Sequence, residues 1–441
     1  MKPRIVILGG GFGGLYTALE LERALAHGAD LEVTLVSQDN FFLFTPMLHE
    51  VAASDLDMTH IVNPIRKLLK RVEFFQGRVE RVSLEDRRVE VSHGADAHVH
   101  TLEYDHLVIG VGNVTNFYGL PGLESDALTM KSLGDAINLR NRLIQNLEEA
   151  DFECADARRA LLTIVVAGGG FAGVETIASV NDFLREAVRF YKNLSETDLR
   201  IVLVHSGPVI LPELSEKLGA YTREKLGARG VEIRLNTRVL AYRDDVVELS
   251  DGSKIPSRLL VWTAGTAPHP ILMKLPCLKD HGRIVASEKM EVPDWPGLWA
   301  VGDCASIPET KTGKPYPPTA QHAIRQGRVL ARNILAATRG EERKPFVFST
   351  LGQLAAIGRR AGVAQILGFQ FSGFIAWWLW RTIYLGKLPR FEKKCRVAMD
   401  WTLDLLFAKD LVQFAPPRPR VAQTLSPHQP EERSMEVVTS S

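Results

Sequence analysis

The sequence has few cysteines and almost no net charge. The cysteines number four and are widely scattered, with no C-x-x-C pair and no spacing typical of a metal site; they are Cys154, Cys277, Cys304 and Cys395. We therefore expect free thiols in a reducing compartment and no bound metal. Lysine and arginine total 53 against 52 for aspartate and glutamate. The resulting net charge of +1 gives no reason to expect a nucleic-acid partner.

The sequence also lacks a long apolar run. Its most apolar stretch, residues 361–384, is interrupted by Gln365, Gln370 and Arg381, so it falls short of the roughly 20 apolar residues that a membrane span needs. Residues 1–4 lead directly into an apolar segment and leave no room for a signal or transit peptide. We expect the catalytic body to stay on the side of the membrane where it is made.

A glycine-rich motif is present close to the start of the chain. The apolar run Ile5 to Leu8 ends at Gly9, and Gly11 and Gly14 complete a G-x-G-x-x-G pattern before apolar residues at helical spacing. This pattern predicts a strand, a tight turn and a helix whose N-terminus can hold a pyrophosphate. One such motif alone is weak evidence, because glycine-rich strand-helix turns also occur without a ligand.

A second copy of the motif strengthens the prediction. The apolar run 161–167 is followed by Gly168, Gly170 and Gly173 and then by another helical pattern. The two copies lie roughly 160 residues apart, about one domain length. We therefore predict an α/β fold with two Rossmann-like dinucleotide-binding domains.

The acidic residue that often holds a ribose is missing at both second strands. Ser37 ends the strand expected at 31–36, with Asp39 two residues later, and His205 ends the strand expected at 199–204. Asp39 could equally well bind the ribose or be a solvent-exposed carboxylate in a loop. Position 205 is a histidine, so no carboxylate is present there to repel the 2′-phosphate of NADPH. We therefore expect the second site to accept NADPH as well as NADH.

Two further turns complete a recognisable set. Thr263 to Gly265 follows a buried strand in the second unit, and Gly302-Asp303 follows the short strand in WPGLWAVGD. Together with the tandem glycine motifs, they resemble the two-dinucleotide flavoprotein reductases. The segments FTPMLHEVA, PPTAQHA and residues 380–407 resemble, within that superfamily, the type II NADH:quinone oxidoreductases, membrane-surface dehydrogenases of respiratory chains that do not pump protons.

This resemblance implies the cofactors, the reaction and several site residues. FAD would bind at the first motif and NAD(P)H at the second, with hydride passing to the flavin and two electrons passing on to a membrane quinone. Asp303, after Gly302, would bind the ribityl chain of FAD. The remaining cofactor contacts implied are Thr45, Pro46, Gly265 and Ala320.

Two residues are candidates for the catalytic site. Glu175, in the first turn after the second motif, either stabilises the helix dipole or points toward the nicotinamide, where the resemblance places a glutamate; we favour the second role. Gln321 lies in the A-Q-x-A segment that borders the quinone side of the flavin in the family. Arg325 replaces a second glutamine, and we expect it either to polarise a quinone carbonyl or to be a solvated helix residue.

Other functions are compatible with parts of the sequence. A sulfide:quinone oxidoreductase needs cysteines near the flavin, and Cys154 and Cys304 are the residues that could serve. The segment 37–54, where disulfide reductases of this superfamily carry their cysteine pair, has none. Two more functions stay open: another pyridine-nucleotide flavoprotein reductase, such as one serving a soluble electron carrier, and a redox-sensing flavoprotein with little turnover.

The C-terminal region is expected to lie on a membrane surface. Residues 361–384 and 397–411 are predicted to be interfacial helices, because aromatic residues are followed by a cluster of cations. Four residues are expected at the headgroups, namely Trp377, Trp378, Trp380 and Tyr384, and four on one face of the second helix, namely Val397, Trp401, Leu405 and Ala408. A buried helical hairpin and a homodimer interface are the competing interpretations.

The expected organisation follows from these assignments. Residues 1–125 and 286–345 form the FAD-binding domain, residues 126–285 form the NAD(P)H-binding domain, and residues 346–415 form the membrane-associating region. Residues 416–441 are expected to be a disordered tail. We expect a peripheral, monotopic protein on the cytoplasmic face of the cell inner membrane.

Overall fold

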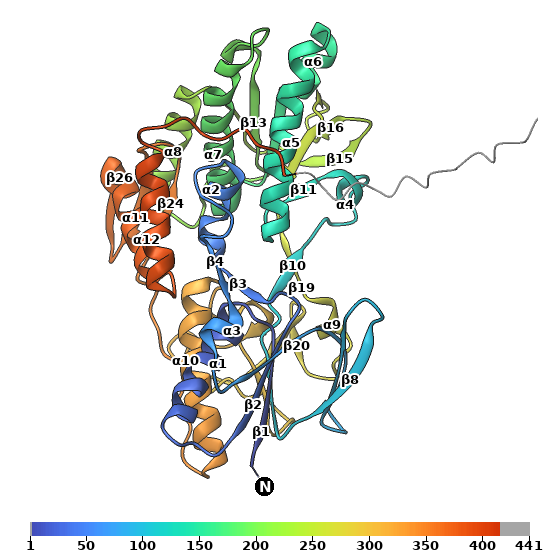
Figure 1. Ribbon diagram of the computed structural model, residues 1–441, viewed down its shortest axis with the longest axis vertical. Helices are drawn as coiled ribbons and strands as arrows, with labels where there is room; N and C mark the ends of the chain where they lie inside the picture. Colours follow the sequence, from blue (N-terminus) through green and yellow to red (C-terminus); the bar gives the residue numbers. More distant parts are fainter. Residues whose placement is uncertain (1, 415–441) are drawn as a thin grey trace, which may run out of the picture.

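The computed structural model describes residues 2–414, so the expected disordered tail lies outside the described residues. Two α/β lobes lie one above the other, and a smaller C-terminal module lies against the side of the upper lobe (Figure 1). Each lobe is built on a five-stranded parallel sheet. The predicted α/β fold with two dinucleotide-binding units is confirmed.

The lower sheet combines four strands from the first 110 residues with one strand that ends at residue 300. Its strand order is β22 (Leu298–Ala300), β9 (His106–Ile109), β1 (Arg4–Leu8), β2 (Glu32–Ser37) and β5 (Glu73–Gln76). All neighbours are parallel, so the carboxyl ends of these strands meet at one edge. Residues 5–8 of the central strand are buried, as expected for a strand covered on both faces. Helices α1 (Phe12–Ala26) and α10 (Ala320–Thr338) pack against each other beside this sheet.

The upper sheet repeats this plan. Its order is β11 (Leu128–Thr129), β18 (Leu259–Trp262), β12 (Thr163–Ala167), β13 (Arg200–Val204) and β14 (Val231–Arg234), again all parallel. The helices of this lobe are α5 (Leu133–Phe152), α6 (Ala155–Leu161), α7 (Phe171–Ala187) and α8 (Glu216–Ala228). Helix α5 begins with a capping box in which Ser132 and Asp135 satisfy each other's backbone N–H groups.

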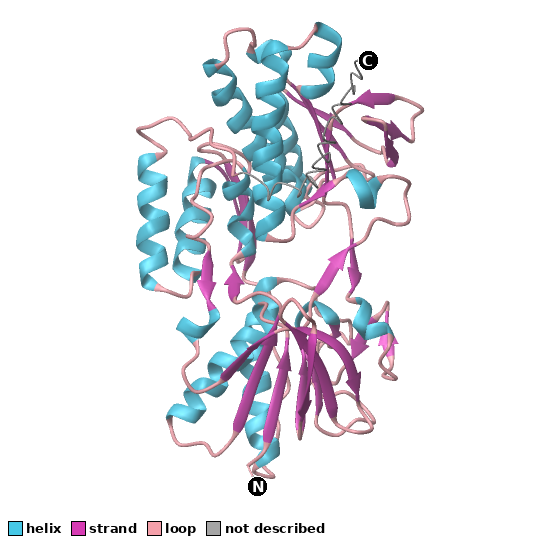
Figure 2. Ribbon diagram, turned by 45° about the vertical axis from the view of Figure 1, so that its right-hand side comes forward, coloured by secondary structure: helices cyan, strands magenta, loops and turns pink. Residues whose placement is uncertain are grey.

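An antiparallel pair of strands connects the two lobes. Strands β10 (Asn113–Thr115) and β19 (Thr266–Pro268) lie side by side between the two main sheets (Figure 2). The minor strands are β3 (Phe41–Leu43), β4 (Val62–Pro64), β6 (Arg78–Ser83), β7 (Arg88–His93), β8 (His98–Glu103), β15 (Val239–Arg243), β16 (Val246–Leu249), β17 (Lys254–Pro256), β20 (Lys279–Asp280), β21 (Arg283–Val285) and β23 (Ala305–Ser306). The short helices are α2 (Leu48–Ala52), α3 (Ile65–Leu68), α4 (Leu123–Asp126) and α9 (Pro270–Met273).

The C-terminal module differs from the sequence-based expectation. Strands β24 (Gly352–Ala356), β25 (Gly362–Ile366) and β26 (Phe369–Gly373) form an antiparallel sheet, so the helix expected from residue 361 begins only at α11 (Phe374–Lys387). The second expected helix, α12 (Phe391–Leu403), ends before Leu405. Within residues 2–414, no helix combines the length and apolar character needed to cross a bilayer.

The burial of the C-terminal aromatic residues also differs from expectation. Trp380 is fully buried and Trp401 is 7% exposed, as is expected of residues that pack on protein. Val397, on the same face as Trp401, is buried as well. The expected headgroup position of Trp380 and the expected lipid-facing surface of α12 are therefore wrong. Trp378, by contrast, is 54% exposed.

Candidate active site

The first glycine motif forms a tight cradle at the carboxyl end of β1. Gly9 has φ +105°, a conformation that strongly favours glycine, and a Cβ on it would lie 2.3 Å from the carbonyl oxygen of Gly110. A Cβ on Gly14 would lie 2.0 Å from the carbonyl oxygen of Gly9. At Gly11, no described heavy atom lies within 4 Å of the Cβ position. The backbone is thus tightly packed at Gly9 and Gly14, and at Gly11 it leaves space for a pyrophosphate to approach.

The second motif repeats this geometry. Gly168 has φ +115°, and a Cβ on Gly173 would lie 1.8 Å from the carbonyl oxygen of Gly168. Near the Cβ position of Gly170 the structure places only Glu213 Oε1, at 3.8 Å. Both cradles therefore fit a dinucleotide at the start of a helix, α1 in one lobe and α7 in the other.

Other residues expected to contact FAD lie at the carboxyl edge of the lower sheet. Gly302 and Asp303 follow β22, and Asp303 Oδ2 accepts a 2.8 Å hydrogen bond from Asn113 Nδ2. Burial raises the pKa of Asp303, while the nearby Lys131 ammonium opposes that shift. Asp39 is exposed beyond the end of β2. These positions surround one edge, as an extended cofactor requires.

The carboxyl edge of the upper sheet carries His205. Its Nδ1 accepts a 3.1 Å hydrogen bond from the backbone N–H of Gly169. Burial lowers the pKa of His205, so the ring is neutral at pH 7 and its proton is on Nε2. Gly265, with φ +128°, ends the turn after β18 and lies against the ring of Tyr118. The ribose end of this site therefore presents a neutral imidazole rather than a carboxylate.

The two lobes meet where helix α2 packs on helix α7. Thr45 and Pro46 lie in the turn that leads into α2, and His49 is buried within that helix. Its Nδ1 lies 3.9 Å from Glu175 Oε2, in the first turns of α7. Residues of the first lobe's FTPMLHEVA segment are thus placed beside the start of the second lobe's cofactor helix.

Glu175 is held by the C-terminal module. Its Oε1 accepts hydrogen bonds from Trp380 Nε1 at 3.0 Å and from the backbone N–H of Ala356 at 3.1 Å. Burial raises the pKa of this carboxyl to about 8, although both hydrogen bonds oppose the rise. The side chain is therefore mostly protonated at pH 7, and Oε2 is left facing His49.

The expected quinone-side residues lie at the start of α10. Ala320 is its first residue, and Gln321 Nε2 donates to the carbonyl oxygen of Gly352 at 2.9 Å. Arg325 donates to the carbonyl oxygen of Gln321, and its guanidinium carbon lies 4.1 Å from the ring centroid of Phe348. Arg325 is thus stacked and half-buried, which differs from a solvated helix residue, the second of its two expected roles.

Comparisons with known proteins identify the family. The family model for pyridine nucleotide-disulphide oxidoreductases matches residues 3–327, and a model for the NDH2 C-terminal domain matches residues 351–410. A probable NADH dehydrogenase of Dictyostelium discoideum is 32% identical over 94% of this chain and 92% of its own length. The type II NADH:quinone oxidoreductase Ndh of Mycobacterium tuberculosis is 31% identical over 92% of this chain and 88% of its own length.

The chain belongs to the type II NADH:quinone oxidoreductases. A solved structure of NDH2 from Plasmodium falciparum in complex with NADH has the same fold, with a TM-score of 0.87 at 21% identity over 93% of this chain and all of that one. The resemblance inferred from the sequence is confirmed, as is the enzyme class, and the expected FAD and NADH cofactors follow from membership of this family.

The cysteines of this type II oxidoreductase are not arranged as a dithiol relay. Cys304 is buried, its Sγ lies 3.3 Å from the carbonyl oxygen of Ile109, and burial raises its pKa to about 11. Cys154 is exposed at the start of α6 in the other lobe. A protonated, enclosed thiol is a poor nucleophile. The geometry therefore does not favour a sulfide:quinone oxidoreductase.

Sequence reasoning missed a second buried carboxyl beside Glu175. Glu50, the neighbour of His49, accepts hydrogen bonds from Trp401 Nε1 at 3.2 Å to each of its oxygens. Burial raises the pKa of Glu50 to about 8, and the Arg381 guanidinium opposes this shift. The signal was present in the sequence, because a histidine and a glutamate stand together within the apolar segment 41–51.

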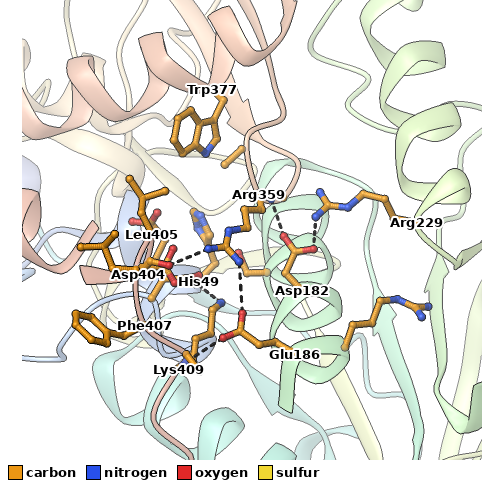
Figure 3. Close-up of a pocket in the computed structure, with 18 of the residues that line it drawn as sticks. His49, Asp182, Glu186, Arg229, Arg359, Trp377, Asp404, Leu405, Phe407 and Lys409 are labelled. Carbon is orange, nitrogen blue, oxygen red and sulfur yellow. Dashed lines mark hydrogen bonds and ion pairs between the residues drawn. The ribbon is translucent and has the colours of Figure 1, made fainter. Parts of the chain in front are cut away.

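A cavity of about 490 Å³ in the type II oxidoreductase is lined by Glu50 and by His49, whose ring faces Glu175. Helices α2, α7 and α11 contribute to its wall, and residues 404–409 after α12 cover one side (Figure 3). Charged side chains dominate the wall and pair with one another, as Asp182 does with Arg229 and Lys409 with Asp55. No sequence motif predicted this cavity, because its wall is assembled from distant segments.

Proposed function

We propose that the enzyme oxidises NADH and reduces a membrane quinone at the junction of the two lobes. The observation that carries this proposal is the meeting of Glu175, His49 and Trp380, which come from the NADH-binding lobe, the FAD-binding lobe and the C-terminal module. FAD, when bound, supplies the chemistry by accepting hydride and passing two electrons on. The chain itself holds the two ring systems together and excludes water.

We propose that the residues around the first cradle contact FAD and that those around the second contact NADH. The cofactor contacts on the FAD side are Gly9, Gly11, Gly14, Asp39, Thr45, Pro46, Gly302, Asp303 and Ala320. Those on the NADH side are Gly168, Gly170, Gly173, His205 and Gly265. Backbone N–H groups at the starts of α1 and α7 bind the two diphosphates. The division at residues 125, 285 and 345 is proposed as the functional partition of the chain.

We assign Glu175 and Gln321 to the reacting region. Glu175 holds a proton at its buried carboxyl, and Gln321 orients the acceptor from the start of α10. Arg325, fixed by Phe348 and the Gln321 backbone, adds positive charge on the same side. Positive charge there stabilises an oxygen of the acceptor as it gains electrons.

We propose that the C-terminal module contacts lipid peripherally on the cytoplasmic face. Its exposed apolar residues include Phe374, Ile375 and Trp378 on α11, which are 58%, 60% and 54% exposed, and Phe391 on α12, which is 78% exposed. Lys387, Lys394 and Arg396 are near them in the sequence, so the composition suits an anionic lipid surface. The alternative is that the same apolar residues form the interface of a homodimer.

The test of the function is steady-state turnover of NADH with a short-chain quinone by the purified yellow protein. We expect turnover that Glu175→Gln slows by about 10²-fold, in the range of a lost proton donor. A redox sensor would instead show flavin reduction without cycling. A protein without bound flavin, or one that NADH does not reduce, would contradict the proposed function.

A further inference from the structure

Reduction of a quinone by NADH consumes a proton from water. NADH provides two electrons and one hydrogen as hydride, while conversion of quinone to quinol takes two electrons and two protons. The balance is NADH + H⁺ + quinone → NAD⁺ + quinol. If the reacting rings are shielded from water, this proton has to cross protein through groups that can hold it.

The cavity beside His49 is partly open to solvent, and its wall is largely polar. Its wall includes Phe190 and Phe407, which are 62% and 66% exposed. In its wall, three buried polar atoms have no hydrogen-bond partner among the described residues: His49 Nε2, Arg381 Nε and Asp404 Oδ1. Buried polar atoms without protein partners need water to satisfy them. His49 lines this cavity and is 4% exposed, so water in the cavity can contact its ring.

His49 is the residue that joins this cavity to Glu175. It is 4% exposed, its Nδ1 lies 3.9 Å from Glu175 Oε2, and its Nε2 on the other side of the ring is unpartnered among the described residues. Glu175 Oε1 is occupied by the hydrogen bonds from Trp380 and Ala356, so only Oε2 is free to exchange a proton. Within residues 2–414, no other basic side chain lies within ion-pair distance of Glu175.

We propose that the cavity is a proton inlet and that His49 relays protons from its water to Glu175. This inference rests on the proposed function. When Glu175 has given its proton to the quinone oxygen, the Nδ1–H of His49 transfers its proton to Oε2 and water protonates Nε2. Only N–H and O–H bonds change, and the net input of this transfer is one proton from solvent.

The protonation states agree with this direction of transfer. Burial lowers the pKa of His49 to about 3, so the ring stays neutral and passes protons by changing tautomer rather than by storing charge. Burial raises the pKa of Glu175 to about 8, so the carboxyl regains its proton at pH 7. The charged groups that line the cavity together with His49 are Glu50, Asp55, Asp182, Arg185, Glu186, Arg189, Arg229, Arg359, Arg381, Asp404 and Lys409, and Glu175 faces the ring from α7.

The relay is tested first by hydrogen exchange at Glu175. The holoenzyme is moved from H₂O to D₂O, and the C=O stretch of the protonated carboxyl is followed in the infrared difference spectrum between oxidised and reduced enzyme. Glu175→Gln assigns the band by removing it. We expect His49→Gln to slow the exchange at least about tenfold, because the amide cannot relay a proton. His106→Gln, a control at a half-buried histidine that accepts a hydrogen bond from Trp299 Nε1, should leave the rate of exchange at Glu175 unchanged.

The second readout separates the two half-reactions by stopped flow. Hydride transfer from NADH needs no proton from water, so its rate should stay within about twofold in His49→Gln, whereas the quinone step should slow about tenfold or more. Imidazole added to His49→Ala should restore the quinone step, which a purely structural role for His49 would not allow. Ala408→Trp, at an exposed position in the cavity wall, should slow exchange and the quinone step by narrowing the inlet.

The outcomes are distinct. Unaltered exchange and an unaltered quinone step in His49→Gln would overturn the relay, and the same result in Ala408→Trp would overturn the cavity as the point of entry. Failure of the unsubstituted enzyme to react with NADH or quinone would instead overturn the proposed function.

Discussion

The indole N–H of Trp380 donates a 3.0 Å hydrogen bond to Glu175 Oε1, which joins the C-terminal helix α11 to the cofactor helix α7 across 205 positions of sequence. Both side chains are buried, so this contact is internal to the protein. The C-terminal module therefore contacts the proposed catalytic residue directly and is also a candidate membrane surface. A change in this module can alter the active site without any change in membrane contact.

Loss of this bond should destabilise the fold. Trp380→Phe removes the donor and leaves Glu175 Oε1 with only the Ala356 N–H, at a cost of about 1–3 kcal/mol in the free energy of unfolding. Denaturant unfolding measures the change. Trp378→Phe, at an exposed position on the same helix, is the matched control and should stay within about 0.5 kcal/mol. Equal effects in the two variants would argue against the bond.

Glu175 should also make stability depend on pH. Its folded pKa of about 8 exceeds the ordinary value of 4.5, so between these values the unfolded state loses the proton first and the free energy of unfolding falls as pH rises. Glu175→Gln keeps an oxygen for both hydrogen bonds and does not titrate. Relative to the unsubstituted protein, it should gain stability from pH 5 to pH 9 by up to about 5 kcal/mol. A difference that is constant with pH would contradict the raised pKa.

Substitution of Gly11 and substitution of Gly14 in the first motif should have different effects: the first on FAD binding, the second on folding. Gly11→Ala places its methyl group in open space, so the apoprotein should fold normally and lose FAD affinity, by roughly tenfold or more if the methyl blocks the pyrophosphate. Gly14→Ala meets the Gly9 carbonyl oxygen and should destabilise the fold itself. Thermal unfolding of apoprotein and flavin content after purification distinguish these effects. Normal FAD content in Gly11→Ala would show that the diphosphate lies elsewhere.

His205 should set the choice between NADH and NADPH. The neutral ring carries no negative charge, so NADPH is accepted, and its use should rise relative to NADH as the pH falls and the ring becomes protonated. His205→Glu introduces a negative charge and should lower kcat/KM for NADPH about tenfold or more relative to NADH. His281→Glu, at an exposed turn, is the control and should leave the ratio unchanged. An unchanged ratio in His205→Glu would place the 2′ position away from this residue.

Lipid contact should depend on the exposed aromatic residues rather than on the buried ones. The double variant Trp378→Asp and Phe391→Asp should reduce sedimentation with anionic vesicles, because both side chains are more than half exposed. Leu278→Asp, at an exposed apolar position outside the C-terminal module, is the control. Unchanged vesicle binding accompanied by loss of a dimer in sedimentation analysis would assign the surface to self-association.

Much of the cofactor-binding fold could be predicted because it is local in sequence. Gly9 and Gly14 must be glycine for reasons set within a few residues, namely a positive φ and a close backbone contact. The same holds for Gly168 and Gly173 in the second lobe. The parallel sheets then follow from apolar strands that alternate with helices.

The C-terminal module could not be predicted in the same way, because distant contacts decide it. Residues 361–373 are apolar enough for either a helix or a strand, and pairing in the sheet of β24, β25 and β26 selects strands. The aromatic composition suggested a membrane surface, yet Trp401 is buried by its contact with Glu50, 351 positions away. Spacing alone does not reveal such a partner.

If the second cradle delivers NADH to a flavin held by the first, and quinone reaches the same flavin, an anaerobic titration will show it in a single experiment. Stoichiometric NADH is added to the purified yellow protein and then a short-chain quinone, while the flavin absorbance is recorded. We predict complete bleaching by NADH and full recovery of the yellow colour on addition of quinone. A flavin that NADH does not bleach, or one that stays bleached in the presence of quinone, would contradict this prediction.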